Sequence, residues 1–481
     1  MTAVLGGGLS GLSAAYYALE NPKLAPVILL EASSRLGGWV QSKKSPSGAV
    51  FELGPRTIRP RGDTGQNTLN LIDDLKLGTK LRPIAVNDPA ASNKFIYTNN
   101  KLHPLPISLK PLFRTCPPLN EPLISTIWRE IRQPSIINKD ESLYSFIERR
   151  VGSHIADYII SPMICGICAG DAKEISVKFL MPSLFRAEQL HGSIFRGMIH
   201  ERLFDQMKPK KPEPWEIVPE KTDKSIMSSA ERAQKSNWAI WALDGGMEQL
   251  PQALASKLYH KHLHIRLGID CKEIFFKPEG VEVRAGDQSK TYERVVSSIP
   301  AKKLARLVEN QHPDLANELG AIPSVTVAVV NLEFAGHVLP IDAFGFLVPP
   351  KEELPILGVI FDSCIIKQES TVLTVMMGGA WFDKYFGNSE NLSTINDHLL
   401  SVALDQVKSI LNIKATPISS NVSILKDCIP QYIVGHNERV DRIKNYILEN
   451  KLPLYLCGAS YDGIGVNDVI FSAKKAVSSI A

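Results

Sequence analysis

A glycine-rich turn near the N-terminus limits what this chain can fold into more than any other feature. Residues 6–11 read GGGLSG, which matches GxGxxG, and they follow a short strand-like run and precede an apolar helical pattern. Glu31 ends the next strand-like run, 20 residues after Gly11. A carboxylate at that place accepts a hydrogen bond from a ribose 2′-hydroxyl and repels a 2′-phosphate. The spacing therefore predicts a βαβ unit that holds the pyrophosphate of NAD or FAD at a helix N-terminus.

Length and composition restrict the class of protein further. With 481 residues, 44% of them hydrophobic and 22% charged, the chain can form two or three domains. The 54 basic and 50 acidic side chains leave a net charge of +4 without a basic cluster interleaved with aromatics, so we expect no nucleic-acid partner. Seven cysteines without framework spacing indicate free thiols in a reducing compartment. The first residues are already strand-like, so we expect no cleavable leader.

Two side-chain patterns resemble metal ligands without predicting a metal site. Cys165 and Cys168 have CxxC spacing, but no second pair follows and the surrounding stretch is apolar and helical. His260, His262 and His264 alternate and would share one face of a strand. We interpret the cysteines as buried thiols and expect no metal site.

Further glycine segments distinguish FAD from NAD. Residues 35–39 (RLGGW) place a glycine pair just past Glu31, and residues 51–56 (FELGPR) follow. Far along the chain, residues 457–468 combine a strand end, glycines and a helix start, where backbone N–H groups and the helix dipole can face the electron-rich end of a flavin. These segments resemble the flavin-containing amine oxidase superfamily. The resemblance implies noncovalently bound FAD.

A more specific resemblance covers nearly the whole chain. It is to the oxygen-dependent protoporphyrinogen oxidase family of animal mitochondria, and it rests on residues 6–11, 37–39, 51–59, 243–247, 297–301, 428–432 and 458–468. It implies that protoporphyrinogen IX is oxidised to protoporphyrin IX by hydride transfer to the flavin. Dioxygen would reoxidise the flavin and give hydrogen peroxide, in the penultimate step of haem biosynthesis. It also implies a homodimer, peripheral at the mitochondrial inner membrane without a cleavable leader, with handover of the product to ferrochelatase.

The resemblance also implies site residues. A substrate slot of apolar side chains with one glycine would sandwich the flat macrocycle. Lys94 stands where the family has an arginine for a substrate propionate, so we expect a looser carboxylate contact. Arg56 would act in catalysis by stabilising charge on the reduced flavin. The slot residues are Met163, Gly166, Phe344, Leu347, Ile360 and Met376. The cofactor-binding residues are Gly6, Gly8, Ser10, Gly11, Glu31, Arg35, Gly37, Gly38, Trp39, Gly54, Pro55, Trp241, Cys271, Val466 and Asn467.

The predicted fold class is α/β and α+β. A Rossmann-like FAD-binding domain is built from residues 1–89, 237–300 and 436–481. A mixed-sheet substrate-binding domain covers residues 301–435, and a helical, membrane-associated domain covers residues 90–206. Residues 207–236 are rich in Lys, Pro, Glu and Ser, which favours a flexible insertion.

Two other functions remain open at this point. One is another amine oxidase superfamily activity, such as that of a polyamine oxidase or a carotenoid desaturase. An aromatic cage beside the flavin would favour an amine substrate, and the predicted slot has none. The other is a non-redox chaperone of the GDP-dissociation-inhibitor type, which shares the fold. The flavin-facing glycines at both ends of the chain argue against this alternative.

Overall fold

The computed structural model describes residues 1–105, 110–204, 227–261, 263–286, 288–387 and 395–480. The chain forms two compact units, and each is assembled from separate segments. Unit 1 contains Met1–Ala91, Trp215–Pro323 and Arg439–Ala481, and unit 2 contains Ser92–Pro214 and Ser324–Glu438. Within the described residues, no helix is long and apolar enough to cross a membrane.

Unit 1 is built on a five-stranded parallel sheet in the order β19-β13-β1-β2-β9. β1 lies at its centre and all four of its residues are buried, as expected of a parallel strand covered on both faces. The predicted βαβ unit is confirmed, because β1 and β2 pair in parallel with Thr2 opposite Val27. The strands are β1 (Thr2–Leu5), β2 (Val27–Leu30), β9 (His264–Arg266), β13 (Arg294–Ser297) and β19 (Leu454–Leu456).

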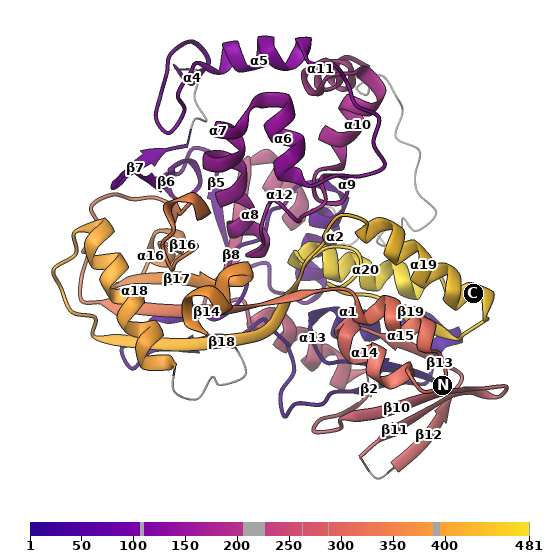
Figure 1. The fold of residues 1–481 in the computed structure, drawn as a ribbon. Helices are drawn as coiled ribbons and strands as arrows, with labels where there is room; N and C mark the ends of the chain where they lie inside the picture. The colour runs from indigo at the N-terminus through magenta and orange to yellow at the C-terminus, as the bar shows by residue number, and fades with distance from the viewer. Residues whose placement is uncertain (106–109, 205–226, 262, 287, 388–394, 481) are drawn as a thin grey trace. The chain divides into compact units, whose positions relative to one another are not determined.

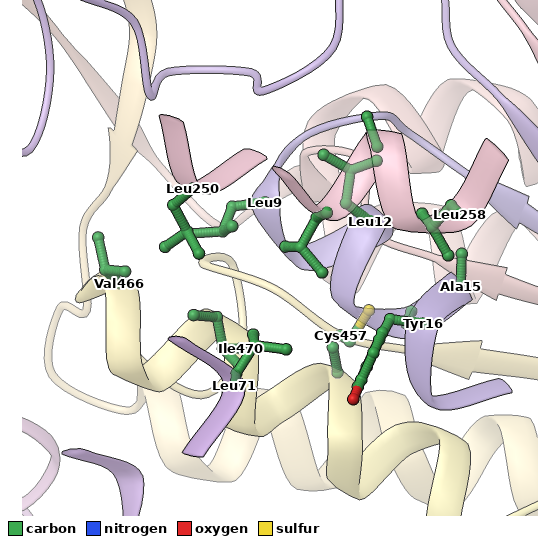
Figure 2. Close-up of a cluster of buried hydrophobic side chains, with 14 of the residues drawn as sticks. Leu9, Leu12, Ala15, Tyr16, Leu71, Leu250, Leu258, Cys457, Val466 and Ile470 are labelled. Carbon is green, nitrogen blue, oxygen red and sulfur yellow. The ribbon is translucent and has the colours of Figure 1, made fainter. Parts of the chain in front are cut away.

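Helices from three distant segments cover one face of this sheet. Leu12, Leu250 and Ile470 lie in one buried cluster, each on a different segment of unit 1 (Figure 2). The core of this unit therefore closes only when all three segments are present. The helices are α1 (Leu9–Leu19), α2 (Gly62–Asp74), α13 (Gln249–His260) and α20 (Val466–Ser478), with a short turn at η1 (Pro22–Leu24).

A second buried cluster in unit 1 shows that the boundary predicted at residue 300 lies further along the chain. Residues 301–320 were expected in the substrate-binding domain, but Leu304 and Leu319 pack with Leu5 of the parallel sheet. The apolar side of α14 thus belongs to the core of unit 1. The elements of this side are α14 (Ala301–Val308), α15 (Pro313–Gly320), α19 (His436–Glu449), β10 (Cys271–Lys277), β11 (Gly280–Ala285) and β12 (Gln288–Tyr292).

Short elements complete unit 1. β3 (Ser42–Lys44) pairs with β4 (Val50–Glu52), and β5 (Leu81–Ala85) pairs with β8 (Trp238–Leu243). Residues 227–236, the described end of the predicted flexible insertion, contain α12 (Ser229–Lys235). Ser228 and Glu231 form a capping box at its start, which explains why this polar stretch is helical. Residues 207–226 of that insertion lie outside the described residues.

Unit 2 is built on a seven-stranded mixed sheet in the order β18-β14-β17-β16-β15-β6-β7. Two of its strands, β6 and β7, come from the segment predicted to be helical. They become strands because β6 pairs in parallel with β15, far along the chain. The strands are β6 (Lys94–Thr98), β7 (Lys101–Pro104), β14 (Ser324–Phe334), β15 (Gly345–Leu347), β16 (Gly358–Ile360), β17 (Thr371–Gly378) and β18 (Ser419–Pro430).

One face of the mixed sheet is closed by packing. Phe346, Val359 and Val375 are opposite one another on adjacent strands and lie in a buried cluster with Leu399 of α18. The other face is left for α8 and for the side chains described below. The helices around the sheet are α16 (Asp362–Ile365), α17 (Phe382–Phe386) and α18 (Asn396–Leu411), with the short turns η4 (Pro350–Glu352) and η5 (Gly379–Trp381). The helix α3 (Pro89–Ser92) belongs to unit 1 except for its last residue.

The predicted helical segment is confirmed over most of residues 110–204 (Figure 1). Its helix α5 buries polar side chains and exposes an apolar one. Thr126 and Glu130 are buried, whereas Trp128 is 56% exposed. A second irregularity is a π-helical turn, η2, between α7 and α8. The helices are α4 (Lys110–Phe113), α5 (Leu123–Arg132), α6 (Leu143–Val151), α7 (Ser153–Ile155), η2 (Ala156–Ile160), α8 (Ser161–Cys168), α9 (Val177–Leu180), α10 (Pro182–His191) and α11 (Ile194–Phe204).

Candidate active site

The glycine turn in unit 1 is shaped by close backbone packing. Gly6 has φ +99°, a conformation that favours glycine, and a Cβ on Gly11 would lie 1.9 Å from the carbonyl oxygen of Gly6. Leu12 donates to the carbonyl of Gly8, which starts α1 without a side-chain cap. The first N–H groups of this helix are therefore available to a phosphate.

Glu31 lies where the sequence predicts a ribose-binding carboxylate. It follows β2 and accepts hydrogen bonds from the N–H groups of Gly7 (2.5 Å) and Ser33 (2.7 Å). Ile269 donates its N–H to the carbonyl of Glu31, so the segment leading to Cys271 runs beside it. Burial raises the pKa of the Cys271 thiol to about 11, so this side chain is a neutral wall next to the carboxylate.

The glycine pair at 37–38 lies directly against the first glycine turn. Gly37 donates to the carbonyl of Gly7 at 2.8 Å, and a Cβ on Gly38 would lie 3.0 Å from the Cα of Gly8. The Arg35 side chain stabilises this loop by donating hydrogen bonds to the carbonyls of Leu36 (3.0 Å) and Gly38. The result is a cradle of bare backbone, as a pyrophosphate site requires.

The segment after β4 places Arg56 beside the same loop. A Cβ on Gly54 would lie 2.0 Å from the carbonyl oxygen of Trp39, so these two backbones touch. Trp39 itself is 45% exposed. Pro55 is partly exposed, and Arg56 is buried, with Nη2 3.5 Å from the carbonyl of Gly54.

The C-terminal residues of the predicted site begin α20. Asn467 donates from Nδ2 to the carbonyl of Arg59 at 2.8 Å, which ties α20 to the N-terminal segment. Among the described residues, its buried Oδ1 has no hydrogen-bond partner. Val466, the first residue of α20, belongs to the buried cluster of Figure 2. Ser10 is buried and donates to Cys457 Sγ at 3.3 Å, so its hydroxyl joins α1 to the strand end before α20.

Trp241, predicted to contact the cofactor, lies in the interior of unit 1. Its side chain is fully buried, and its backbone exchanges hydrogen bonds with Ile58 at 2.8 and 2.9 Å. In the described part of the chain, no acceptor faces its indole N–H. A buried donor without an acceptor costs free energy unless a further group completes it.

These features fit a flavin dinucleotide. The glycine cradle and the start of α1 suit the pyrophosphate, Glu31 suits the ribose, and the start of α20 suits an electron-rich ring. Trp241 Nε1 and Asn467 Oδ1, two of the buried polar atoms that have no partner among the described residues, are further candidates for contact with such a group. The predicted cofactor residues thus lie together in unit 1.

The predicted substrate residues share one face of the sheet in unit 2. Directly paired residues point to the same face, and the register pairs Leu347 with Gly358 and Gly358 with Met376. Two residues along the same strands, Lys94 pairs with Gly345 and Gly345 with Ile360. The side chains of Lys94, Leu347, Ile360 and Met376 on this face are only partly buried.

Residues near this face add a cation and a helix. Lys94 Nζ lies 5.7 Å from the centroid of the Phe344 ring. On α8, a Cβ at Gly166 would come within 2.9 Å of the Leu347 side chain, and Met163 is partly buried one turn earlier. The structure therefore brings all the predicted substrate residues together in unit 2.

Sequence reasoning missed two glycines at the centre of this face. A Cβ on Gly345 would lie 2.1 Å from the carbonyl of Val359, and one on Gly358 would lie 2.5 Å from that of Phe346. They add no side chain of their own between Ile360 and Met376, and the Leu347 side chain lies next to Gly358, with Cδ2 3.1 Å from where a Cβ would be. Glycine inside a strand pattern is a signal of close approach by a ligand or backbone, and could have drawn attention to them.

Comparison with known proteins defines the class first. The model of the flavin containing amine oxidoreductase family matches residues 9–481, so the chain belongs to this family and its cofactor is FAD. Protoporphyrinogen oxidase of Homo sapiens is 36% identical over 99% of this chain and 97% of its own length. That of Schizosaccharomyces pombe is 30% identical over 100% and 98%. Within the flavoproteins, the chain belongs to the protoporphyrinogen oxidase family.

A solved structure agrees with this placement. A putative protoporphyrinogen oxidase from Exiguobacterium sp. 255-15 superposes with a TM-score of 0.78 and 26% identity, covering 100% of this chain and 98% of its own. The predicted fold class is confirmed. Neither the other amine oxidase activities nor the non-redox chaperone is favoured by these relatives.

Proposed function

We propose that this protein oxidises protoporphyrinogen IX to protoporphyrin IX, with dioxygen as electron acceptor and hydrogen peroxide as product. The observation that carries the proposal is the apolar, glycine-centred sheet face of unit 2, in a chain of the protoporphyrinogen oxidase family. A flat tetrapyrrole needs a wide apolar wall with few protruding side chains, and this face provides one.

The chain's own residues have mainly binding tasks. Leu347, Ile360 and Met376 pack against the macrocycle and exclude water from it. Lys94 pairs with a substrate propionate through one ammonium group, without the two-pronged geometry of an arginine. Bound FAD would accept two electrons in each of three rounds of oxidation, with reoxidation by dioxygen between them, and the buried Arg56 would stabilise negative charge near it. Aromatisation drives the reaction, so a strong general base is not required.

The visible spectrum of the purified holoprotein tests this proposal. Under anaerobic conditions, protoporphyrinogen IX should bleach the flavin bands, and air should restore them while porphyrin fluorescence rises. A yellow protein whose bands stay unchanged would contradict the substrate and direct the search to amines. A colourless protein after refolding with FAD would favour the non-redox alternative.

We also propose that unit 2 binds an anionic membrane surface peripherally. The helices α4, α5, α10 and α11 carry exposed apolar side chains close to the basic residues Arg114, Arg129 and Arg132. An apolar surface edged by basic groups is typical of a segment that lies in the membrane interface. The exposed apolar residues are Phe113, Trp128, Leu190, Met198 and Ile199 on these helices, with Ile136 and Ile137 on the segment between α5 and α6.

Vesicle flotation tests the membrane proposal. The protein should float with anionic liposomes, and a variant with Trp128→Asp and Ile137→Asp should not. Leu448→Asp is the matched control, because Leu448 is 76% exposed on α19 in unit 1. Equal flotation of all three proteins would refute the role of these helices.

The remaining family properties belong to the same proposal. They are a peripheral place at the mitochondrial inner membrane, a homodimer, and handover of protoporphyrin IX to ferrochelatase. The resemblance to animal protoporphyrinogen oxidases supports them. Light scattering of the purified protein checks the dimer, and fractionation of cells checks the location.

A further inference from the structure

A π-helical turn precedes the helix that carries two of the predicted substrate contacts. Residues 156–160 form this turn, and α8 with Met163 and Gly166 follows directly. Pro162 has no N–H to donate, and the hydroxyl of Ser161 bonds the carbonyl of Ala156 at 2.8 Å. An extra residue in a helical turn rotates the helix before it by about 100° relative to the helix after it. The π-helical turn thus sets the direction in which the side chain of Asp157, one of its residues, points.

Asp157 joins three elements through its carboxylate. Oδ1 accepts a hydrogen bond from the hydroxyl of Tyr144 on α6 at 2.9 Å. Oδ2 accepts one from Lys351 Nζ on η4 at 2.7 Å, and this bond raises the pKa of Lys351 above its usual range. Lys351 also lies over the ring of Tyr158, 5.4 Å from its centroid. The ammonium of Lys351 is therefore held by the π turn from two sides.

The two ends of this link lead to the two elements that carry predicted substrate residues, β15 and α8. Lys351 comes four residues after Leu347, which lies on the sheet, and Asp157 comes shortly before Met163, which lies on α8. The helix and the sheet already touch where Gly166 meets the Leu347 side chain. A second fixed point is needed to hold two elements at one spacing and one angle, and the Asp157–Lys351 pair provides it.

We infer that Asp157 and Lys351 are positioning residues that fix α8 against β15 and so set where Met163 and Gly166 lie beside the sheet face proposed to bind a flat tetrapyrrole. The inference rests on the proposed function, because that function defines the substrate. Lys351 is 56% exposed, so the ion pair contributes little to global stability. Its loss should therefore leave the fold and the bound FAD intact while α8 becomes less well placed.

The test compares Asp157→Asn, Lys351→Met and the double variant as holoproteins. We expect KM for protoporphyrinogen IX to rise about three- to tenfold in each single variant, with kcat and FAD content changed less than about twofold. The double variant should be no worse than either single one, because each change breaks the same link. Lys384→Met is the control: Lys384 is 52% exposed and pairs with Glu353 at 3.6 Å nearby, and its KM should stay unchanged.

Several results would overturn the inference. They are an unchanged KM in the single variants, additive effects in the double variant, the same KM rise in Lys384→Met, or a loss of bound FAD and melting temperature that accounts for the defect. Hydrogen exchange supplies a readout without substrate: amides of Ser161–Cys168 should exchange faster in Asp157→Asn than in the wild type. If the wild type does not oxidise protoporphyrinogen, the proposed function fails, whereas the exchange rates still decide whether the pair holds α8. Equal exchange rates would refute the positioning role.

Discussion

At the scale of single residues, Gly11 makes the strictest demand. Its Cα lies so close to the Gly6 carbonyl that a methyl group has no room, and both backbones are part of the phosphate cradle. We expect Gly11→Ala to lose most of its bound FAD, measured as flavin absorbance per protein. Gly320→Ala is the control, because a Cβ there meets only the side chain of Ala305 at 3.7 Å. Full FAD content in Gly11→Ala would contradict the cradle.

Lys94 gives the second residue-scale prediction. Lys94→Met keeps the length of the side chain and removes its charge, so a propionate loses a charge-assisted hydrogen bond worth about 1.5 kcal/mol. We expect KM for protoporphyrinogen IX to rise about tenfold, with little change in kcat. Steady-state kinetics with Lys101→Met, an exposed lysine on the neighbouring strand, provide the comparison. Equal KM values for the two variants would remove Lys94 from the substrate site.

Single residues differ in how far sequence could place them. Glu31 was predictable, because the distance from a glycine turn to the end of the next strand is nearly fixed in a βαβ unit. Gly345 and Gly358 carried only a general signal, since glycine occurs in strands for several reasons and the pairing is needed to show that they lie on the same face. Asp157 was equally hidden, because its direction depends on a π turn that propensity does not indicate.

At the scale of elements, α5 depends on a buried charge network. Arg150 is fully buried and donates to the Glu130 carboxylate and to the Gln133 and Pro134 carbonyls. Glu188, also buried, accepts two bonds from Arg149 and lies 3.4 Å from Arg150. These groups bind the polar side of α5, which explains why its apolar side faces outward.

Removal of one partner should therefore be costly. Arg150→Met leaves the buried Glu130 carboxylate without its cation, whereas Glu188 keeps its bonds from Arg149, and we expect a loss of about 3–5 kcal/mol in the stability of unit 2. Urea unfolding followed by far-UV circular dichroism measures this. Arg442→Met is the control, because its ion pair with Glu318 is solvent-exposed and should contribute less than about 1 kcal/mol. Equal losses of stability in the two variants would show that the buried charge network contributes no more than an exposed ion pair.

Elements were predictable where their pattern is local. The parallel strands of unit 1 show as short apolar runs, and β14 and β17 show as long ones. β6 was missed because its five residues do not alternate clearly between apolar and polar side chains. They form a strand because they pair with β15, far along the chain. The place of α14 was missed for a similar reason: its apolar side is evident, but the surface it covers is not encoded nearby.

At the scale of the whole molecule, His312 links the stability of unit 1 to pH. Burial lowers its pKa; Nδ1 meets the Tyr446 hydroxyl at 3.2 Å, and its buried Nε2 has no hydrogen-bond partner among the residues that the structure describes. As pH falls through about 6.5, the unfolded chain takes up a proton that the folded unit resists. The stability is therefore complete above this pH and declines below it.

The prediction compares melting temperatures at pH 7.5 and 5.5, followed by release of FAD fluorescence. The melting temperature of His312→Gln should fall less between pH 7.5 and pH 5.5 than that of the wild type does. His398→Gln, which changes an exposed histidine on α18, should behave like the wild type. An identical acid loss in His312→Gln would assign the pH dependence to other groups.

The assembly of unit 1 from three distant segments has a consequence for the newly made chain. The ribosome releases β1 and the glycine turn first, but β13 follows much later and β19 with α20 comes last. One edge of β1 stays open to water or to a chaperone until β13 is made, and the apolar side of α1 stays partly open until α20 is made. Uptake of the flavin should thus follow the end of translation, and a nascent chain stalled before residue 439 should emerge colourless.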